Sequence, residues 1–164
     1  MGCYTTMTAA VKHGIRRVIN TGPHFTIAGP SYEEYDYGLN EEMPSQSGSQ
    51  LYALTKSVGQ EMCRVFTESH DVFVLTLLFY NFRYPDDGRG AHQDLTPFTV
   101  SWSDAAAAFP LALDIPLEKL PSRCEVFNVF ADLPHGKFSN EKAKRILGWK
   151  PTHLFEQYWR KARG

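Results

Sequence analysis

Apolar residues along the first half of the chain alternate between helix-like and strand-like spacing. A helix is predicted at residues 3–13 with Gly14 as its stop, and a short β-like run follows at 17–20. A second helix is predicted at 50–69. The apolar residues that we expect to form its buried stripe, because they are spaced three or four apart, are Leu54, Val58, Met62, Val65 and Phe66.

The second half shows the same alternation. Residues 71–80 are almost continuously apolar, as in a strand buried on both faces of a parallel sheet. Ser103 and Asp104 are expected to cap an alanine-rich helix that ends near 113. The remaining elements that the pattern predicts are strands at 98–102 and 125–130 and helices at 141–147 and 154–162. Helices and strands alternate, which predicts an α/β fold with a mainly parallel sheet.

Composition excludes several classes of protein. The chain has 164 residues and a formal net charge of −1, so it forms one ordinary domain without the basic surface that nucleic acid requires. No apolar stretch is long enough to cross a membrane, and no signal-peptide pattern is present, so we expect a cytoplasmic protein. The cysteines Cys3, Cys63 and Cys124 show no CxxC spacing and are expected to be reduced and buried. The histidines show no metal-binding spacing, so no metal site is expected.

The strongest chemical signal is Tyr52 with Lys56 four residues later, on one face of the predicted helix at 50–69. A tyrosine that acts as an acid–base catalyst near neutral pH needs its phenolate stabilised by roughly 4 kcal/mol. An ammonium about 5 Å away supplies roughly 3 kcal/mol of this at an effective dielectric constant near 20. The alternative interpretation is that Tyr52 and Lys56 form an exposed pair on a helix surface without a catalytic role.

A long polar segment at 22–50 precedes the helix, and loops of that length are usually functional or disordered.

Five segments in order resemble the extended short-chain dehydrogenase/reductase superfamily, the NAD-dependent epimerase/dehydratase family. "SQLYALTKSVGQEMCRVF" followed by "DVFVLTLLFYN" resembles its active-site helix and next strand. "FTVSWSDAAAAF", "EVFNVFA" and "EKAKRILGWKP" resemble later elements, the last being similar to an LGW-x-P signature. The branch of the family that is most similar in pattern is the uronate dehydrogenases. The stretch "TGPHFTIAG" and the short connection before the helix at 141–147 resemble the corresponding segments of these enzymes. Nucleotide-sugar epimerases usually carry an Arg where this chain has Pro97.

The resemblance implies roles for particular residues. Tyr52 would be the general acid/base, and Lys56 would hold the nicotinamide ribose of NAD or NADP and lower the pKa of Tyr52. The hydroxyl of the family's third catalytic residue would come from Thr21, or from Thr26 as a fallback. If the family's serine corresponds instead to Gly22, the triad is incomplete.

Three further residues would bind substrate or cofactor by the same resemblance. His24 would contact a substrate oxygen, and Asn81 would line the pocket for substrate and nicotinamide. Arg89 could face a carboxylate or phosphate, because guanidinium pairs with such groups in a bidentate manner. Each has an alternative without a binding role: His24 would be an exposed loop histidine, Asn81 a turn residue at a strand end, and Arg89 a solvated loop arginine. The expected substrate is a sugar, sugar acid or nucleotide-sugar.

The resemblance also implies a division of the chain. Residues 1–80 would be the second half of a Rossmann-like domain, and residues 81–164 a small substrate-binding C-terminal region, the two forming one compact unit. The family's GxxGxxG turn, which holds the dinucleotide, is absent from the sequence. We therefore expect a truncated enzyme that lacks its N-terminal cofactor-binding half. The alternatives are a non-catalytic binding or assembly protein on the same half-fold, and an unrelated α/β domain. The family also implies a homodimer built from the helices at 3–13 and 50–69.

Overall fold

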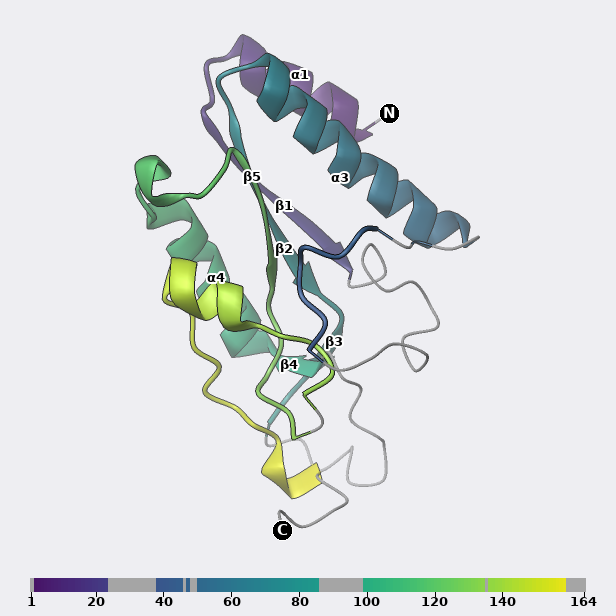
Figure 1. The fold of residues 1–164 in the computed structure, drawn as a ribbon, viewed down its shortest axis with the longest axis vertical. Coiled ribbons are helices and arrows are strands. Elements are labelled where there is room, and N and C mark those ends of the chain that lie inside the picture. Colours follow the sequence, from purple (N-terminus) through teal and green to yellow (C-terminus); the bar gives the residue numbers. More distant parts are fainter. Residues whose placement is uncertain are drawn as a thin grey trace.

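The computed structural model describes residues 2–23, 38–45, 47, 50–85, 99–134 and 136–158. A parallel sheet forms its centre, with strands in the order β1 (Arg17–Pro23), β2 (Phe73–Phe79) and β5 (Cys124–Asn128) (Figure 1). The predicted α/β fold with a mainly parallel sheet is confirmed. The middle strand β2 is the apolar run of the sequence, and six of its seven residues are buried. Side chains of such a strand find apolar partners on both faces of the sheet.

The two faces of the sheet are covered by different helices. Helices α1 (Gly2–Lys12) and α3 (Leu51–Ser69) lie together on one side, and α4 (Trp102–Asp114) lies on the other (Figure 1). Alternate residues of β2 point to alternate faces. Val74 therefore packs in the cluster with Met7 and Cys63, while Leu75 and Leu77 pack with the alanines of α4.

The boundaries of α1 and α3 agree with the predicted helices, but the predicted buried stripe of α3 is correct only in part. Its buried residues are Ala53, Cys63 and Thr67, while Leu54, Val58 and Val65 are about half exposed. The spacing of three or four residues was read correctly as helical. The side that faces the sheet is built mainly from small residues. Phe66 of the predicted stripe packs against the cluster of Met7 and Cys63, whereas Leu54, Val58 and Val65 are left on the outer surface of α3.

The start of α4 also differs from the prediction. The cap is Ser101, whose hydroxyl accepts a hydrogen bond from the backbone N–H of Asp104 at 2.9 Å, in place of Ser103 and Asp104. Ser101 ends a short strand, β4 (Thr99–Ser101), that pairs in parallel with β3 (Asn81–Arg83). These two strands form a second, small sheet beyond the end of β2.

The C-terminal elements differ from the prediction in helix type. The helix expected at 141–147 has a helical start followed by a π-helical turn, Ala143–Leu147, and ends at Gly148 with φ 69°. A left-handed residue at this position satisfies the last carbonyls of a helix, and glycine adopts it without strain. The helix expected at 154–162 contains a 3-10 turn, Glu156–Tyr158, and its last four residues lie outside the described residues. A further 3-10 turn, Leu117–Lys119, precedes β5.

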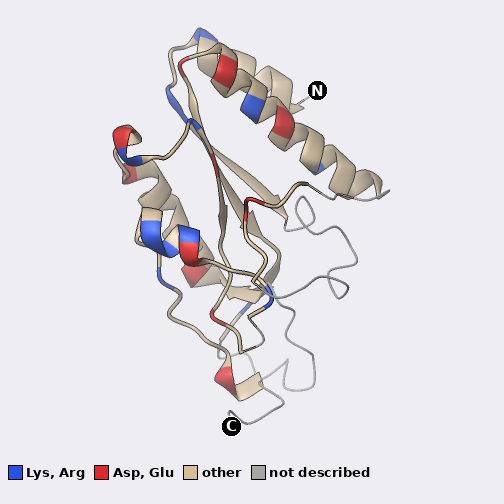
Figure 2. Cartoon of the chain, in the orientation of Figure 1, with Lys and Arg blue, Asp and Glu red and all other residues tan. Residues whose placement is uncertain are grey.

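Basic and acidic residues are interspersed along the described chain rather than confined to one element (Figure 2). Helix α1 carries a single charged residue, Lys12, and the acidic residues of α3 are confined to its second half. None of the helices in the described ranges could span a bilayer, because none is both long and apolar enough.

Candidate active site

Parallel strands end at a common edge of the sheet, and the candidate site lies at that edge. In the register of β1 on β2, Thr21 pairs with Leu77 and Pro23 with Phe79, so both strands end together. Helix α3 begins after Gln50, which places Tyr52 in its first turn and Lys56 in its second. Side chains that follow parallel strands, or begin the next helix, gather at this edge in α/β folds.

Three of the predicted catalytic residues line one pocket. It has a volume of about 320 Å³, and its lining residues are Thr21, Gly22, Pro23, Tyr52, Lys56, Phe79, Tyr80 and Phe82. The predicted residues Thr21, Tyr52 and Lys56 therefore meet, although Thr21 lies more than thirty positions before the other two in the sequence. Their chemical roles remain predictions.

Tyr52 and Lys56 are both exposed, and their mutual arrangement is specific. The Lys56 ammonium lies over the face of the Tyr52 ring, 5.8 Å from the ring centroid. The Thr55 hydroxyl donates to the Tyr52 carbonyl at 2.8 Å, a contact within the first turns of the helix. The positive end of the α3 dipole adds to the lysine charge, and both favour negative charge at this end of the helix.

The pocket also contains aromatic residues that sequence reasoning missed. Phe82 forms part of the wall and stacks on Trp102, with ring centroids 4.3 Å apart and planes 14° apart. Trp102 is the first residue of α4, so this stack connects the pocket wall to the helix on the opposite face of the sheet. The signal available in the sequence was the aromatic run after the apolar strand, "FYNF", which could have been assigned to a pocket wall.

The other predicted site residues are less well placed or lie outside the described residues. Asn81 opens β3 and pairs with Thr99, directly after the pocket residue Tyr80, and it is not among the residues that line the pocket. His24, Thr26 and Arg89 lie outside the described residues, as does much of the polar segment at 22–50.

A partly buried carboxylate, that of Glu41, lies beside the end of the neighbouring strand β5. Burial raises the pKa of Glu41, while a hydrogen bond from the backbone N–H of Asn128 at 2.6 Å acts in the opposite direction. Beside it, the bridge between Leu39 and Phe138 attaches the segment 38–45 to residues 136–139. Glu41 therefore fixes the chain that leads into α3, and it does not line the pocket with Tyr52.

The fold resembles sugar-converting enzymes of known structure. Uronate dehydrogenase from Agrobacterium tumefaciens matches with a TM-score of 0.74 at 20% identity, over 96% of this chain and 54% of that chain. Glucuronic acid dehydrogenase from Chromohalobacter salexigens matches with a TM-score of 0.72 at 22% identity, over 94% and 53%. UDP-glucuronic acid 4-epimerase from Bacillus cereus, solved in complex with NAD, gives 0.69 at 15% identity, over 94% and 62%.

These similarities show the fold, a partial Rossmann-like α/β arrangement. The chain spans about half the length of the two dehydrogenases. It matches no protein-family model and no curated protein sequence.

Proposed function

We propose that the chain supplies the acid–base half of an NAD(P)-dependent oxidoreductase or epimerase of the extended short-chain dehydrogenase/reductase superfamily. The observation that carries this proposal is the meeting of Thr21, Tyr52 and Lys56 in one pocket at the ends of parallel strands. Structures of the same fold include proteins named uronate dehydrogenase, glucuronic acid dehydrogenase and UDP-glucuronic acid 4-epimerase, the last in complex with NAD. The sequence resemblance and the pocket therefore agree on one type of chemistry.

In this proposal each of the three side chains has a separate task. As a phenolate, Tyr52 accepts the proton of a substrate hydroxyl that is being oxidised, and as a neutral phenol it returns that proton in the reverse direction. The Lys56 ammonium, which lies against the Tyr52 ring, stabilises negative charge at the phenol and holds ribose hydroxyls. The Thr21 hydroxyl donates a hydrogen bond to the reacting substrate oxygen and orients it.

The pocket residues fit one part of a dinucleotide. Hydroxyl groups and an ammonium suit a ribose, and the aromatic wall formed by Phe82 and Phe79 suits the flat nicotinamide ring. When bound, the nicotinamide would accept or deliver the hydride. The pyrophosphate and adenosine need a glycine turn at a helix N-terminus, and the sequence has no GxxGxxG for them. The described residues of the pocket therefore fit the nicotinamide end of the dinucleotide.

The substrate that we propose is a sugar, sugar acid or nucleotide-sugar, with a uronate as the first choice. Residues 1–80 would form the second half of a Rossmann-like domain and 81–164 the substrate side. Strand β5 and helix α4 come from the second segment and pack into the same sheet, so the two would act as one unit. The second candidate is a binding or assembly protein, which the exposed apolar surface of α3 favours.

The identity of the third catalytic hydroxyl can be tested in a protein that supplies the dinucleotide site. We define the joined protein as this chain fused behind, or mixed with, a dinucleotide-binding segment that carries GxxGxxG. Thr21→Val in the joined protein is expected to lower the turnover number about 10–100-fold, because one hydrogen bond to the reacting oxygen is lost. The measurement is the steady-state rate of nicotinamide reduction with a panel of uronates and nucleotide-sugars.

Gly22→Ser provides the matched comparison for Thr21. A Cβ at position 22 would lie 3.2 Å from the Leu78 Cδ2, so a small shift of that side chain accommodates it. If Thr21 is the third residue, Gly22→Ser leaves the rate within about threefold of the wild type. If Thr21→Val has no effect and Gly22→Ser raises the rate, the assignment of Thr21 is wrong.

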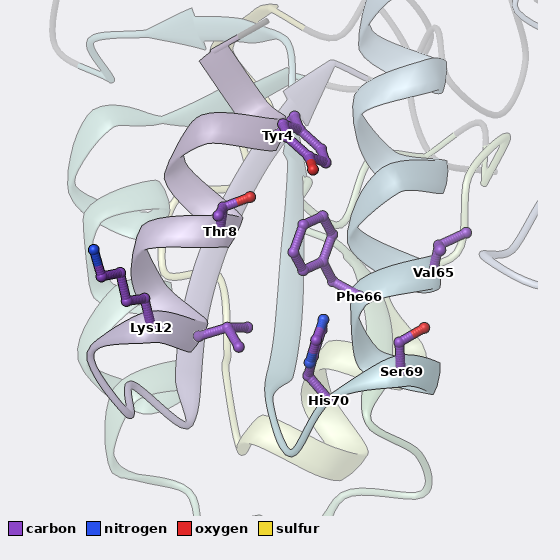
Figure 3. Close-up of a pocket in the computed structure, with 8 residues that line it drawn as sticks. Tyr4, Thr8, Lys12, Val65, Phe66, Ser69 and His70 are labelled. Carbon is purple, nitrogen blue, oxygen red and sulfur yellow. The ribbon is translucent and has the colours of Figure 1, made fainter.

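We also propose that α1 and α3 form a homodimer interface. A groove of about 430 Å³ runs between them, and Figure 3 shows the Tyr4, Phe66 and His70 side chains between the two helices. Exposed apolar side chains continue along this surface: Tyr4, Leu51, Leu54, Val58 and Val65. Few charged residues lie on α1 and on the first half of α3. Burial of this surface in a dimer would therefore require little desolvation of charged groups. A second copy would present the same surface, as a two-fold interface requires.

Val58→Glu is expected to convert this dimer into a monomer, because a charge would be buried in the apolar interface. Val58 is 49% exposed in the single chain, so the substitution should leave the monomer folded. Leu113→Glu on α4 is the control, because Leu113 is 53% exposed on the other side of the sheet. Light scattering at micromolar concentration gives the mass. A monomeric wild type, or a dimer that survives Val58→Glu, would count against the interface.

A further inference from the structure

Two cysteines from different helices meet in the interior of the protein. Cys3 lies in the first turn of α1 and Cys63 in the third quarter of α3, sixty positions apart in the sequence. Their sulfur atoms are 3.8 Å apart, which is van der Waals contact. Both belong to the cluster that packs α1 and α3 against the sheet, together with Met7 and Val74. Neither sulfur is bonded to another cysteine in this structure.

The two thiols differ in access to solvent. Cys63 is 1% exposed, whereas Cys3 is partly exposed and its Sγ donates to the Gly59 carbonyl at 3.4 Å. A small oxidant can therefore reach Cys3 first. A sulfur–sulfur bond is about 2.05 Å long, so the two sulfur atoms must approach each other by less than 2 Å for the bond to form.

We propose that Cys3 and Cys63 are an oxidative modification site, at which a peroxide joins α1 to α3 through an intramolecular disulfide. The Cys3 thiolate attacks one oxygen of hydrogen peroxide, the O–O bond breaks, and Cys3 becomes a sulfenic acid as hydroxide leaves and is protonated to water. The Cys63 sulfur then attacks the Cys3 sulfur, displaces the hydroxyl as water, and loses its proton. In sum, two thiols and one peroxide give one disulfide and two waters.

The environment of Cys63 suits a resolving thiol rather than an attacking one. Burial, together with the nearby Cys3 sulfur, raises the pKa of Cys63 to about 12. Little thiolate is present at neutral pH, so Cys63 does not react with peroxide before Cys3 does. The contact of Cys63 with Cys3 compensates for this low reactivity, because the attack of Cys63 on the oxidised Cys3 sulfur takes place within one molecule.

The disulfide would change the part of the protein that carries the candidate site. It fixes α1 on α3, the helix that holds Tyr52 and Lys56, and closes a loop of sixty residues. Constraining the unfolded chain in this way is expected to raise the melting temperature by on the order of 10 °C, reversibly with dithiothreitol. This inference concerns the chain's own thiols and does not depend on the proposed function.

The test is oxidation of the 164-residue chain by excess hydrogen peroxide, followed by mass spectrometry of the intact protein and of its peptides. The expected result is loss of the mass of two hydrogen atoms and one cross-linked peptide pair that contains Cys3 and Cys63. Cys3→Ser and Cys63→Ala should each abolish the cross-link, and Cys124→Ser should leave it unchanged. Cys124 is the matched control, because it is partly buried on β5 and outside this pair.

Oxidation in guanidinium chloride shows whether the fold selects the pair. The unfolded chain should give a mixture of the three possible pairings, and the folded chain should give the Cys3–Cys63 bond alone. The inference is overturned if the folded chain gives the same mixture. It is also overturned if Cys3 of two molecules pair, or if Cys3 proceeds to sulfinic acid in the wild type as fast as in Cys63→Ala.

Discussion

Replacing Tyr52 by phenylalanine in the joined protein is expected to lower the turnover number about 10²–10⁴-fold. The substitution removes the only group of the pocket that we assign to proton transfer, and leaves the ring that packs beneath the Lys56 ammonium. Because the ring and its cation contact remain and one hydrogen bond to the nicotinamide ribose is lost, the affinity for NAD should fall by no more than about tenfold. A much larger loss in the turnover number than in the affinity is the expected behaviour of an acid–base residue.

Tyr80→Phe is the control for this substitution. Tyr80 lines the same pocket and is exposed to a similar extent, but it follows β2 rather than lying one helical turn from Lys56. Initial rates of nicotinamide reduction with saturating uronate or nucleotide-sugar give the two turnover numbers. Equal rates for the two variants would mean that the tyrosine assignment is wrong.

Asp104→Asn is expected to lower the free energy of unfolding by about 2–4 kcal/mol, because a buried carboxylate loses charge-assisted hydrogen bonds. Asp104 is 3% exposed and accepts four hydrogen bonds from two residues. Thr152 donates through its backbone N–H and hydroxyl, and His153 through its backbone N–H and Nδ1, at 2.6–3.0 Å. In asparagine an NH2 group replaces one carboxylate oxygen, and this group cannot accept the hydrogen bonds that Thr152 or His153 donates. The C-terminal segment would then lose its attachment to α4.

Urea unfolding at neutral pH measures this loss, with Asp114→Asn as the control, because Asp114 is exposed at the other end of α4.

The stability that Asp104 provides should also depend on pH. Burial alone would raise the pKa of Asp104, but the hydrogen bonds from Thr152 and His153 hold it below its usual value. A lowered pKa in the folded state means that the carboxylate stabilises the fold above its unfolded pKa, near 3.9. The difference between wild type and Asp104→Asn should therefore shrink as the pH falls below about 4. A difference that is the same at pH 7 and at the lowest pH would contradict this account.

Most of the secondary structure followed from the sequence because the local signals were strong. The apolar run became β2, Gly14 and Gly148 end their helices with positive φ, and alternation of helices and strands gave the parallel sheet. The spacing of Tyr52 and Lys56 was enough to place them on one helix face. These features depend on neighbouring residues, and local physics determines them.

Features that depend on what a helix packs against were predicted less well. The buried face of α3 was assigned to its large apolar residues, yet close packing on the sheet selected Ala53 and Cys63. The contact of Cys3 with Cys63 joins two helices and leaves no pattern in the sequence. The attachment of Thr152 and His153 to Asp104 likewise crosses almost fifty positions. Tertiary contacts of this kind cannot be read from periodicity.

The candidate site was predictable in part. Tyr52 and Lys56 were singled out by their spacing and Thr21 by the family resemblance, and the three line one pocket because strand ends and helix starts meet at one edge of a parallel sheet. Phe82 was missed because an aromatic residue after a strand is as typical of the protein core as of a pocket wall. Its contact with Trp102 also depends on the pairing of β3 with β4, which the sequence pattern did not predict.

The central claim is that this chain holds the nicotinamide end of a dinucleotide and depends on another segment for the rest. Isothermal titration calorimetry with NAD tests it most directly, on the 164-residue chain and on the joined protein. Two hydrogen bonds of about 1–1.5 kcal/mol each from Tyr52 and Lys56 do not offset the several kcal/mol that association costs. The account predicts no measurable binding by the chain alone and saturable binding by the joined protein. Micromolar binding of NAD to the 164 residues by themselves, or none by the joined protein, would contradict it.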